Sequence, residues 1–365
     1  MVSFADKCRT RLLDSIIDEG TPITELLFHV DLTLVEEHLK TKYYSKDSRK
    51  FSFDIGLMLR LVVLKKFRNL SFRKTLYSLT NEDCLNLRIP QINGEYRIPS
   101  SSSFHGFMKY RLGEEGFREI MELVGAKLAK AADKAEEGII DSTPLEASRY
   151  NPHALFNPHY QIKMDKAHIF HYGSYPHYMV YSNGTTNDKP CFYPLIQKIA
   201  RMNPEMSAIV LDAGYDSFEI HASIWRTFGI HPLIQFREDA VLHDEGTSEG
   251  INYRVNKMWK EGGDIHQPIE KKLQFLYDHG RKDQVGKYLR NINCLDKDFQ
   301  SKCKNRSQCE RKHKHIKDTV KFDIRGLLHT SKEMYTYASF ISYQILILAH
   351  AQLKIKNVNV FCDYI

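Results

Sequence analysis

Three acidic residues stand where a folded chain could hold them rigidly. Asp141 follows the apolar run Gly-Ile-Ile, Asp212 follows Ala-Ile-Val-Leu, and Glu310 lies near the start of a helical pattern. Carboxylate oxygens are ligands that Mg²⁺ prefers, and two such ions about 3.5–4 Å apart promote phosphoryl transfer. Taken singly, each acid could equally be a helix cap or a turn residue. The three are far apart in sequence, so only the fold could bring them together.

The segment around Glu310 is strongly basic. From Lys302 to Lys321 it holds eight Lys or Arg residues against two acids. The eight are Lys302, Lys304, Arg306, Arg311, Lys312, Lys314, Lys317 and Lys321. A carboxylate inside such a run fits a site that handles phosphodiesters, because neighbouring cations contact phosphate. A solvated basic helix face would give the same pattern, so both interpretations stay open.

Cysteine and histidine residues near Glu310 offer a competing chemistry. A zinc site could be drawn from Cys294, Cys303, Cys309, His313 and His315. Their spacing lacks the paired C-x₂₋₄-C that is commonest in structural zinc sites, so the sequence disfavours zinc. On a predicted hairpin, His168 and His171 would fall on opposite faces of a strand, which favours surface or packing roles.

Composition sets the outer limits. The chain has 365 residues, 42% hydrophobic and 27% charged, with a formal net charge of +7. This is globular composition, and the excess of positive charge suggests a polyanionic partner. Seven cysteines, an odd number, do not make a disulfide framework. The most apolar stretch, residues 338–353, is shorter than the ~20 residues of a membrane span. We therefore expect a cytoplasmic protein with no membrane segment.

The elements that must position the acids follow from periodicity. Residues 1–135 have a helical pattern, and after Gly138 the period changes. We predict a strand reaching Asp141, a hairpin over 166–185, helices over 191–202 and 217–228, and strands over 207–211 and 231–236. This alternation favours an α/β core with a mixed sheet. Residues 238–300 are irregular and polar, and we predict an insertion with short strands there.

Several motifs together resemble one family. They are LMLRLVVLKKFRNLSFRKTL in the helical part, IIDSTPLEA around Asp141, TTNDKP at 185–190, VLDAGYDS around Asp212, and Arg306, Glu310 and Lys317 at their spacing. The chain resembles the DDE-type transposases of insertion sequences (the IS-four-like superfamily), which have an RNase H-like core. Cys303 stands where those proteins have a tyrosine.

The resemblance implies a fold, a site and partners. It implies that Asp141, Asp212 and Glu310 are catalytic and bind Mg²⁺, with Mn²⁺ able to substitute. It also implies that Arg306 and Lys317 contact the phosphates of the terminal inverted repeats. The DNA partners would be those repeats and a target DNA. The enzyme would act as a homodimer on DNA at the prokaryotic nucleoid.

The expected domains follow from the pattern and the resemblance. Residues 1–135 would form an all-helical, DNA-binding domain. Residues 136–237 and 301–365 would form the RNase H-like catalytic core, with a β-rich insertion at 238–300 before the last catalytic helix. Arg311 and Lys314 would add phosphate contacts from the basic run. In the helical domain, a cluster of cations would contact DNA: Lys65, Lys66, Arg68 and Arg73.

Two other functions remain open on the sequence alone. A relic that has lost cleavage would still bind DNA through its N-terminal helices. An RNase H-like nuclease outside transposition would keep the carboxylates without terminal repeats flanking its gene. Replacement of Asp141 by Asn separates binding from cleavage.

Overall fold

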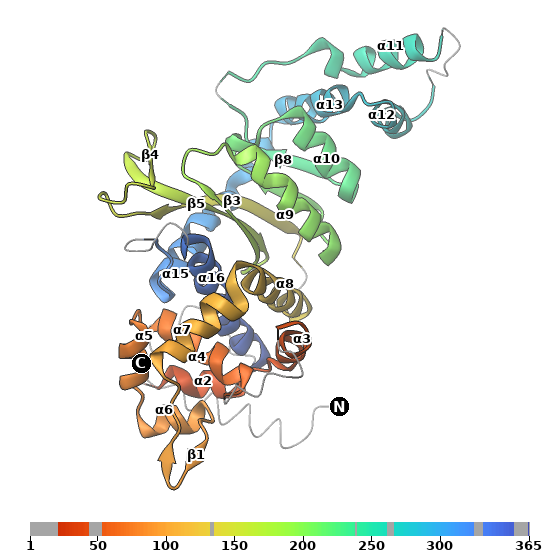
Figure 1. The fold of residues 1–365 in the computed structure, drawn as a ribbon. Helices are drawn as coiled ribbons and strands as arrows, with labels where there is room; N and C mark the ends of the chain where they lie inside the picture. The colour runs from red at the N-terminus through yellow and green to blue at the C-terminus, as the bar shows by residue number, and fades with distance from the viewer. Residues whose placement is uncertain are drawn as a thin grey trace, which may run out of the picture.

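A mixed sheet separates two groups of helices in this computed structural model (Figure 1). The structure describes residues 21–43, 53–131, 135–237, 239–260, 266–324, 331–353 and 364. The N-terminal helices and the last helix lie below the sheet in Figure 1, and α9 and α10 lie above it. A further helical lobe, α11–α13, extends beyond α10.

The described part of the N-terminal segment is helical, as predicted. Its helices are α2 (Ile23–His29), α3 (Thr33–Tyr43), α4 (Ile55–Phe67), α5 (Phe72–Tyr77), α6 (Asn81–Asn86), α7 (Ser101–Gly106), the π-helix η1 (Phe107–Leu112) and α8 (Gly113–Ala131). One small hairpin, β1 (Gln91–Ile92) and β2 (Glu95–Tyr96), interrupts them. Its turn residues Asn93 and Gly94 have φ of 53° and 82°. Asn-Gly is a strong sequence signal for such a turn, so this hairpin was predictable.

The sheet has the predicted mixture of parallel and antiparallel strands. Its strands are β3 (Glu137–Glu146), β4 (Leu155–Asn157), β5 (Ile162–Tyr172), β6 (Tyr175–Asn183), β7 (Ala208–Leu211) and β8 (His231–Ile234). The order is β4-β5-β3-β7-β8, and β6 also pairs with β5. β3 runs parallel to β7 and antiparallel to β5. The expected hairpin is β5–β6, and the expected RNase H-like α/β fold is confirmed.

Helices cover both faces of this sheet. α9 (Asp188–Met202) and α10 (Phe218–Phe228) pack on one face through an apolar cluster that includes Phe170, Phe192 and Leu211. α16 (Lys332–Leu353) packs against α8, α4 and β6 on the other side. Its residues are buried almost all round, which explains its continuous apolar sequence without a membrane. None of the described helices is long and apolar enough to cross a bilayer.

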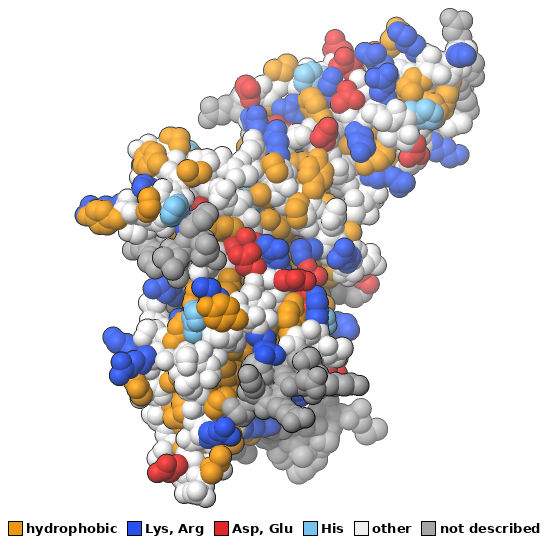
Figure 2. All heavy atoms as spheres, viewed as in Figure 1, with side chains coloured by type: hydrophobic (Ala, Val, Ile, Leu, Met, Phe, Trp, Pro, Cys, Tyr) orange, Lys and Arg blue, Asp and Glu red, His pale blue; other side chains and the backbone are white. Residues whose placement is uncertain are grey.

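The prediction of short strands in the insertion was wrong. The described residues between β8 and Glu310 form η3 (Asp244–Gly246), α11 (Ser248–Met258), α12 (Ile269–Asp278), α13 (Lys282–Leu295), α14 (Phe299–Lys302) and η4 (Cys303–Arg306). The helices bury a small apolar core at helical spacing: Ile251, Val255, Leu273, Leu276, Val285 and Leu289. The polar residues form the solvent faces of these amphipathic helices, and Lys/Arg and Asp/Glu side chains intermingle over this lobe in Figure 2.

Candidate active site

Two of the three predicted acids meet where the parallel pairing of β3 with β7 ends. Asp141 lies inside β3, which continues to Glu146, so the strand does not end at this acid as predicted. In the register of β3 with β7, Ile140 lies opposite Leu211. Asp141 follows Ile140 and Asp212 follows Leu211, so the backbone places the two aspartates side by side. The carboxyl ends of parallel strands are a common place for ligand sites in α/β folds. The sheet therefore makes the proximity that the sequence could not show.

Backbone amides hold both carboxylates in place. Asp141 Oδ1 accepts a hydrogen bond of 2.9 Å from the amide of Ser142. Asp212 Oδ1 accepts one of 2.6 Å from the amide of Ala213. Asp141 is buried, whereas the Asp212 side chain is 36% exposed. The pair thus joins a buried carboxylate to one that faces solvent.

The third acid comes from helix α15 (Ser307–Thr319). Glu310 is exposed in its first turn, and its neighbour Cys309 is buried against the sheet beside Ile139 and Val210. This packing fixes the helix start on the same sheet face as Asp141. The helix ends at Thr319, and the described residues after it, through Ile324, are not helical.

A guanidinium stands between the two aspartates. Arg306 Nη1 lies 3.8 Å from Asp141 Oδ1 and 3.7 Å from Asp212 Oδ1. The carboxylates are arranged around one positive charge, and all the donors are hard oxygens. Such a donor set fits Mg²⁺ or Mn²⁺. The oxygens of Asp141, Asp212 and Glu310 do not all lie within 4.8 Å of one another, so Glu310 has to turn inward to complete the set.

The charges around the site shift the pKa of Asp141. Burial raises the pKa of this carboxyl from 3.8 to about 7. Arg306 opposes the rise, whereas the negative charges of Asp212 and Glu310 add to it. A carboxyl with such neighbours gains most from a bound cation, because the cation offsets both burial and repulsion.

Asp188 is a further acid that we did not single out. It begins α9, within the TTNDKP segment, and its Oδ1 accepts a 2.8 Å hydrogen bond from Lys166 Nζ. Its Oδ2 lies 3.5 Å from Ser142 Oγ, next to Asp141. A Cβ added at Gly214 would come 2.8 Å from the same Oδ2, so a larger residue there would displace the Asp188 carboxylate. The segment itself was noticed, but only the fold brings it to the site.

The predicted cations of α15 divide into two groups. Arg311 and Lys314 are exposed along the helix. Lys317 is instead near its other end, in a pocket of about 270 Å³ that it shares with Asn69 and Glu146. This pocket joins the end of β3 to the end of α4. Lys317 is thus on the helix that carries Glu310 but away from the aspartates.

The predicted N-terminal cations have different environments. Lys66 is buried, and its Nζ donates to the carbonyl of Tyr335. Arg68 makes two hydrogen bonds to Asp83, of 2.9 and 3.0 Å. These two side chains join helices, so they are not free for phosphate. Arg73 is exposed.

Lys65 is half-buried, between the buried Lys66 and the exposed Arg73, and its amine lies over aromatic rings. Its Nζ is 4.8 Å from the ring centroid of Phe72 and 5.7 Å from that of Tyr335. Burial lowers its pKa to about 8, and Lys321 adds to this effect. A group that is poorly solvated and close to another cation would be stabilised by a phosphate.

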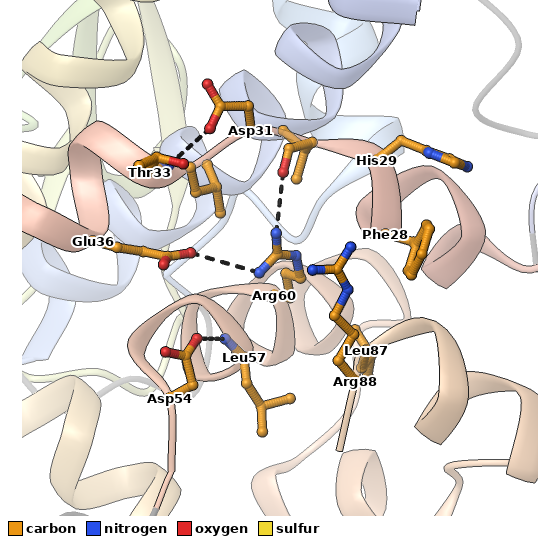
Figure 3. Close-up of a pocket in the computed structure, with 12 residues that line it drawn as sticks. Phe28, His29, Asp31, Thr33, Glu36, Asp54, Leu57, Arg60, Leu87 and Arg88 are labelled. Atoms are coloured by element: carbon orange, nitrogen blue, oxygen red, sulfur yellow. Dashed lines mark hydrogen bonds and ion pairs between the residues drawn. The ribbon is translucent and has the colours of Figure 1, made fainter. Parts of the chain in front are cut away.

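A separate pocket in the helical part has a structural explanation. Figure 3 shows this hollow of about 510 Å³, with Arg60 near its centre. Arg60 donates to the carbonyls of Leu27 and Val30, at 2.9 and 3.0 Å. Glu36 lies 3.8 Å from the same guanidinium. These contacts tie α2 and α3 to α4, far along the chain from Asp141, Asp212 and Glu310.

Cys303, where the resemblance led us to expect a tyrosine, has a packing role. Cys303 is buried with Phe299 and Leu233 in the apolar cluster under η4. It packs, and does not reach the carboxylates. Tyr160, in the turn after β4, is 40% exposed. Partial burial of its ring raises the pKa of the hydroxyl, and the charges of Asp141 and Asp188 add to the rise. A tyrosine therefore stands near the acids, on a different element.

Comparison with known families gives two matches. A family model described as transposase DDE domain matches residues 133–343. A second, described as transposase domain (DUF772), matches residues 11–109. No curated protein and no solved structure matches the chain.

Proposed function

The chain belongs to the DDE transposase family, and from this premise we propose that it cuts the ends of its own insertion sequence and joins them to target DNA by two-metal phosphoryl transfer. Members of this family are enzymes that cleave and join DNA with divalent metal ions. The observation that carries the proposal is the position of Asp141 and Asp212 directly after the last parallel pair of β3 and β7, with Glu310 in the first turn of α15.

The three carboxylates would hold the metal ions. Asp141 and Asp212 supply two anchored oxygens, and Glu310 supplies the third from a helix that packs on the same sheet. When bound, Mg²⁺ or Mn²⁺ stabilises the attacking and leaving oxygens of an in-line displacement. The protein needs no covalent intermediate, so no serine or tyrosine nucleophile is required.

Arg306 has a second role in this proposal. It and a divalent cation need the same oxygens of Asp141 and Asp212, so the loaded site leaves its guanidinium for a phosphate. Arg311 and Lys314 extend the positive charge along the exposed side of α15. Lys317 continues it toward α4, which carries Lys65, and α5, which carries Arg73. These cations would follow the DNA backbone and carry no sequence information.

The assembly on DNA follows from the chemistry. Two ends must be cut and joined together, and each chain offers one set of carboxylates. We therefore propose a homodimer on paired terminal inverted repeats, with residues 1–135 contributing to end binding. The substrate is genomic DNA, so the enzyme would work at the nucleoid.

The direct test is cleavage of a supercoiled plasmid that carries the terminal repeats flanking the gene. The wild-type protein should cut at the repeats with Mg²⁺ or Mn²⁺ and join the ends to a second plasmid. Asp141→Asn should bind the repeats in a mobility-shift assay without cutting. Cutting that ignores the repeats would support a nuclease, and binding without cutting by the wild type would support a relic.

A further inference from the structure

A second group of metal-binding side chains lies buried between β5 and α15. The group consists of His171, Cys309 and His313, and their ligand atoms all lie within 4.8 Å of one another. His171 and Cys309 are fully buried, and His313 is 5% exposed. The carboxylates discussed above are not part of this group.

The fold brings the three together by simple geometry. Cys309 and His313 are four residues apart on α15, so they share one face of the helix. His171 lies on β5 opposite Ile139 of β3. Ile139 is two residues before Asp141, so His171 and Asp141 face the same side of the sheet. Lys312 fastens the helix there by donating a 2.6 Å hydrogen bond to the carbonyl of Gly173.

The histidines of this group lack the partners that buried histidines normally have. Neither ring nitrogen of His171 has a hydrogen-bond partner, and Nε2 of His313 has none. By contrast, both ring nitrogens of the buried His168 are bonded, to Tyr215 and Ser182 at 2.8 Å. A buried polar atom without a partner costs about 1–3 kcal/mol, so three of them in one place point to a missing ligand.

We propose that His171, Cys309 and His313 bind a zinc ion, with water as the fourth ligand. Two imidazole nitrogens and one sulfur suit zinc and do not suit Mg²⁺. A tetrahedral zinc ion separates such ligands by about 3.3–3.8 Å, so the side chains close by about 1 Å to meet it. On binding, the Cys309 S–H bond breaks, the sulfur binds the metal as thiolate and the proton passes to solvent.

The ion would act as a clamp on the start of α15. It ties the helix to β5 directly beside Glu310, which is the residue after Cys309. This consequence for catalysis rests on the proposed function, whereas zinc binding itself does not. Of the five residues weighed from sequence, Cys309 and His313 belong to this site. Cys303 packs in the apolar cluster, and His315 Nδ1 lies 2.7 Å from Tyr343 Oη.

The test is the zinc content of the full-length protein, measured by elemental analysis after purification, incubation with Zn²⁺ and desalting. Wild type should retain about one zinc ion per chain. Cys309→Ser should lose at least tenfold in affinity. Cys303→Ser is the matched control, because Cys303 is also buried on this sheet face but has no histidine beside it. Circular dichroism checks that the variants fold.

A cobalt-loaded wild-type protein avoids any doubt about variant folding. Co²⁺ should give a near-ultraviolet thiolate-to-cobalt absorption band. Added Zn²⁺ should displace the Co²⁺ ion and thereby abolish the band. A wild type without retained zinc, an absent band, or Cys309→Ser that holds zinc as well as Cys303→Ser would each overturn the proposal. None of these readouts uses DNA cleavage, so failure of the proposed function would leave them unchanged.

Discussion

The two sides of α15 present opposite chemistry within adjacent residues. Glu310 is exposed on the side of the helix where, in the proposed function, it would join Asp141 and Asp212. Cys309, one residue earlier, is fully buried and faces two histidines. Successive residues on a helix point about 100° apart, so one helix start can serve both places.

The difference teaches how burial sorts the two kinds of site. The site of Asp141 and Asp212 has solvent access through Asp212. This access suits an ion that keeps bound water and a site that DNA must reach. The nitrogen–sulfur group is buried, so the proposed ion would be shielded from bulk solvent and would serve the packing of α15 on β5. The comparison can be broken by variants that act on one side and spare the other.

The largest effect should come from the oxygen side. Asp141→Asn removes a charge that the ions need, so cleavage at the repeats should fall by more than about 100-fold, beyond the loss caused by changing residues that only support metal ligands. A plasmid cleavage assay measures this. The zinc content should stay at the wild-type value, and loss of zinc here would contradict the separation of the two sites.

The next effect should come from the buried side. Cys309→Ser should lower the cleavage rate by about 10–100-fold, because a positioning residue acts through Glu310. Excess Mg²⁺ should recover part of the rate. The Cys303→Ser variant should cleave at the wild-type rate. Equal losses of rate in both variants would mean that the Cys309 effect is a general packing defect and not loss of a metal ion.

The pH dependence should distinguish the sides as well. The pKa of Asp141 is about 7, and metal binding requires its deprotonated form. The apparent affinity for Mg²⁺ should therefore fall about tenfold for each pH unit below 7. Titration of Mg²⁺-dependent cleavage between pH 5.5 and about 8.5 measures it. An affinity that is flat across pH 7 would contradict the buried, carboxylate-rich setting of Asp141.

The Asp141 carboxyl also affects the free energy of unfolding of the metal-free protein. Its folded pKa is raised above 3.8, so the stability that protonated Asp141 contributes is present below that pH and is lost as pH rises to about 7. In Asp141→Asn this loss should disappear. Thermal unfolding in the presence of a chelator, compared at the two ends of that window, checks the sign.

The smallest effect should come from His315, the histidine of this run that faces away from both sites. Its Nδ1 is 2.7 Å from Tyr343 Oη. His315→Phe should lower the free energy of unfolding by about 1 kcal/mol and leave zinc content and cleavage unchanged. Denaturant unfolding measures the loss. A loss of zinc in this variant would mean that the boundary of the buried site is wrong.

Strand-end patterns made part of the site predictable. Asp141 and Asp212 each end a short apolar run, and the fold places them together as expected of parallel strands. The mixed sheet and the N-terminal helices were predictable because burial imposes a period on the sequence, whereas the RNase H-like character of the sheet was implied by the family resemblance. The insertion was not, since its helices bury only one narrow stripe each and otherwise read as polar.

The rest of the site depends on contacts that no local pattern encodes. Asp188 reaches Ser142 only because α9 begins beside β3. The sequence assigned His171 to packing, because His168 on the same strand faces the other way and cannot bind the same metal ion. The residues that lie beside His171 come instead from a helix, with Cys309 138 positions away. The Cys309–His313 spacing on one helix face was visible in the sequence, but it gains meaning only with His171.

The most direct measurement is anomalous diffraction from crystals of the protein with Mn²⁺ and a cleaved repeat end. Data at the manganese edge should show a peak among the carboxylates of Asp141, Asp212 and Glu310. Data at the zinc edge should show a separate peak among His171, Cys309 and His313. A manganese peak that lies away from the three carboxylates would contradict the central claim that they form the catalytic metal site.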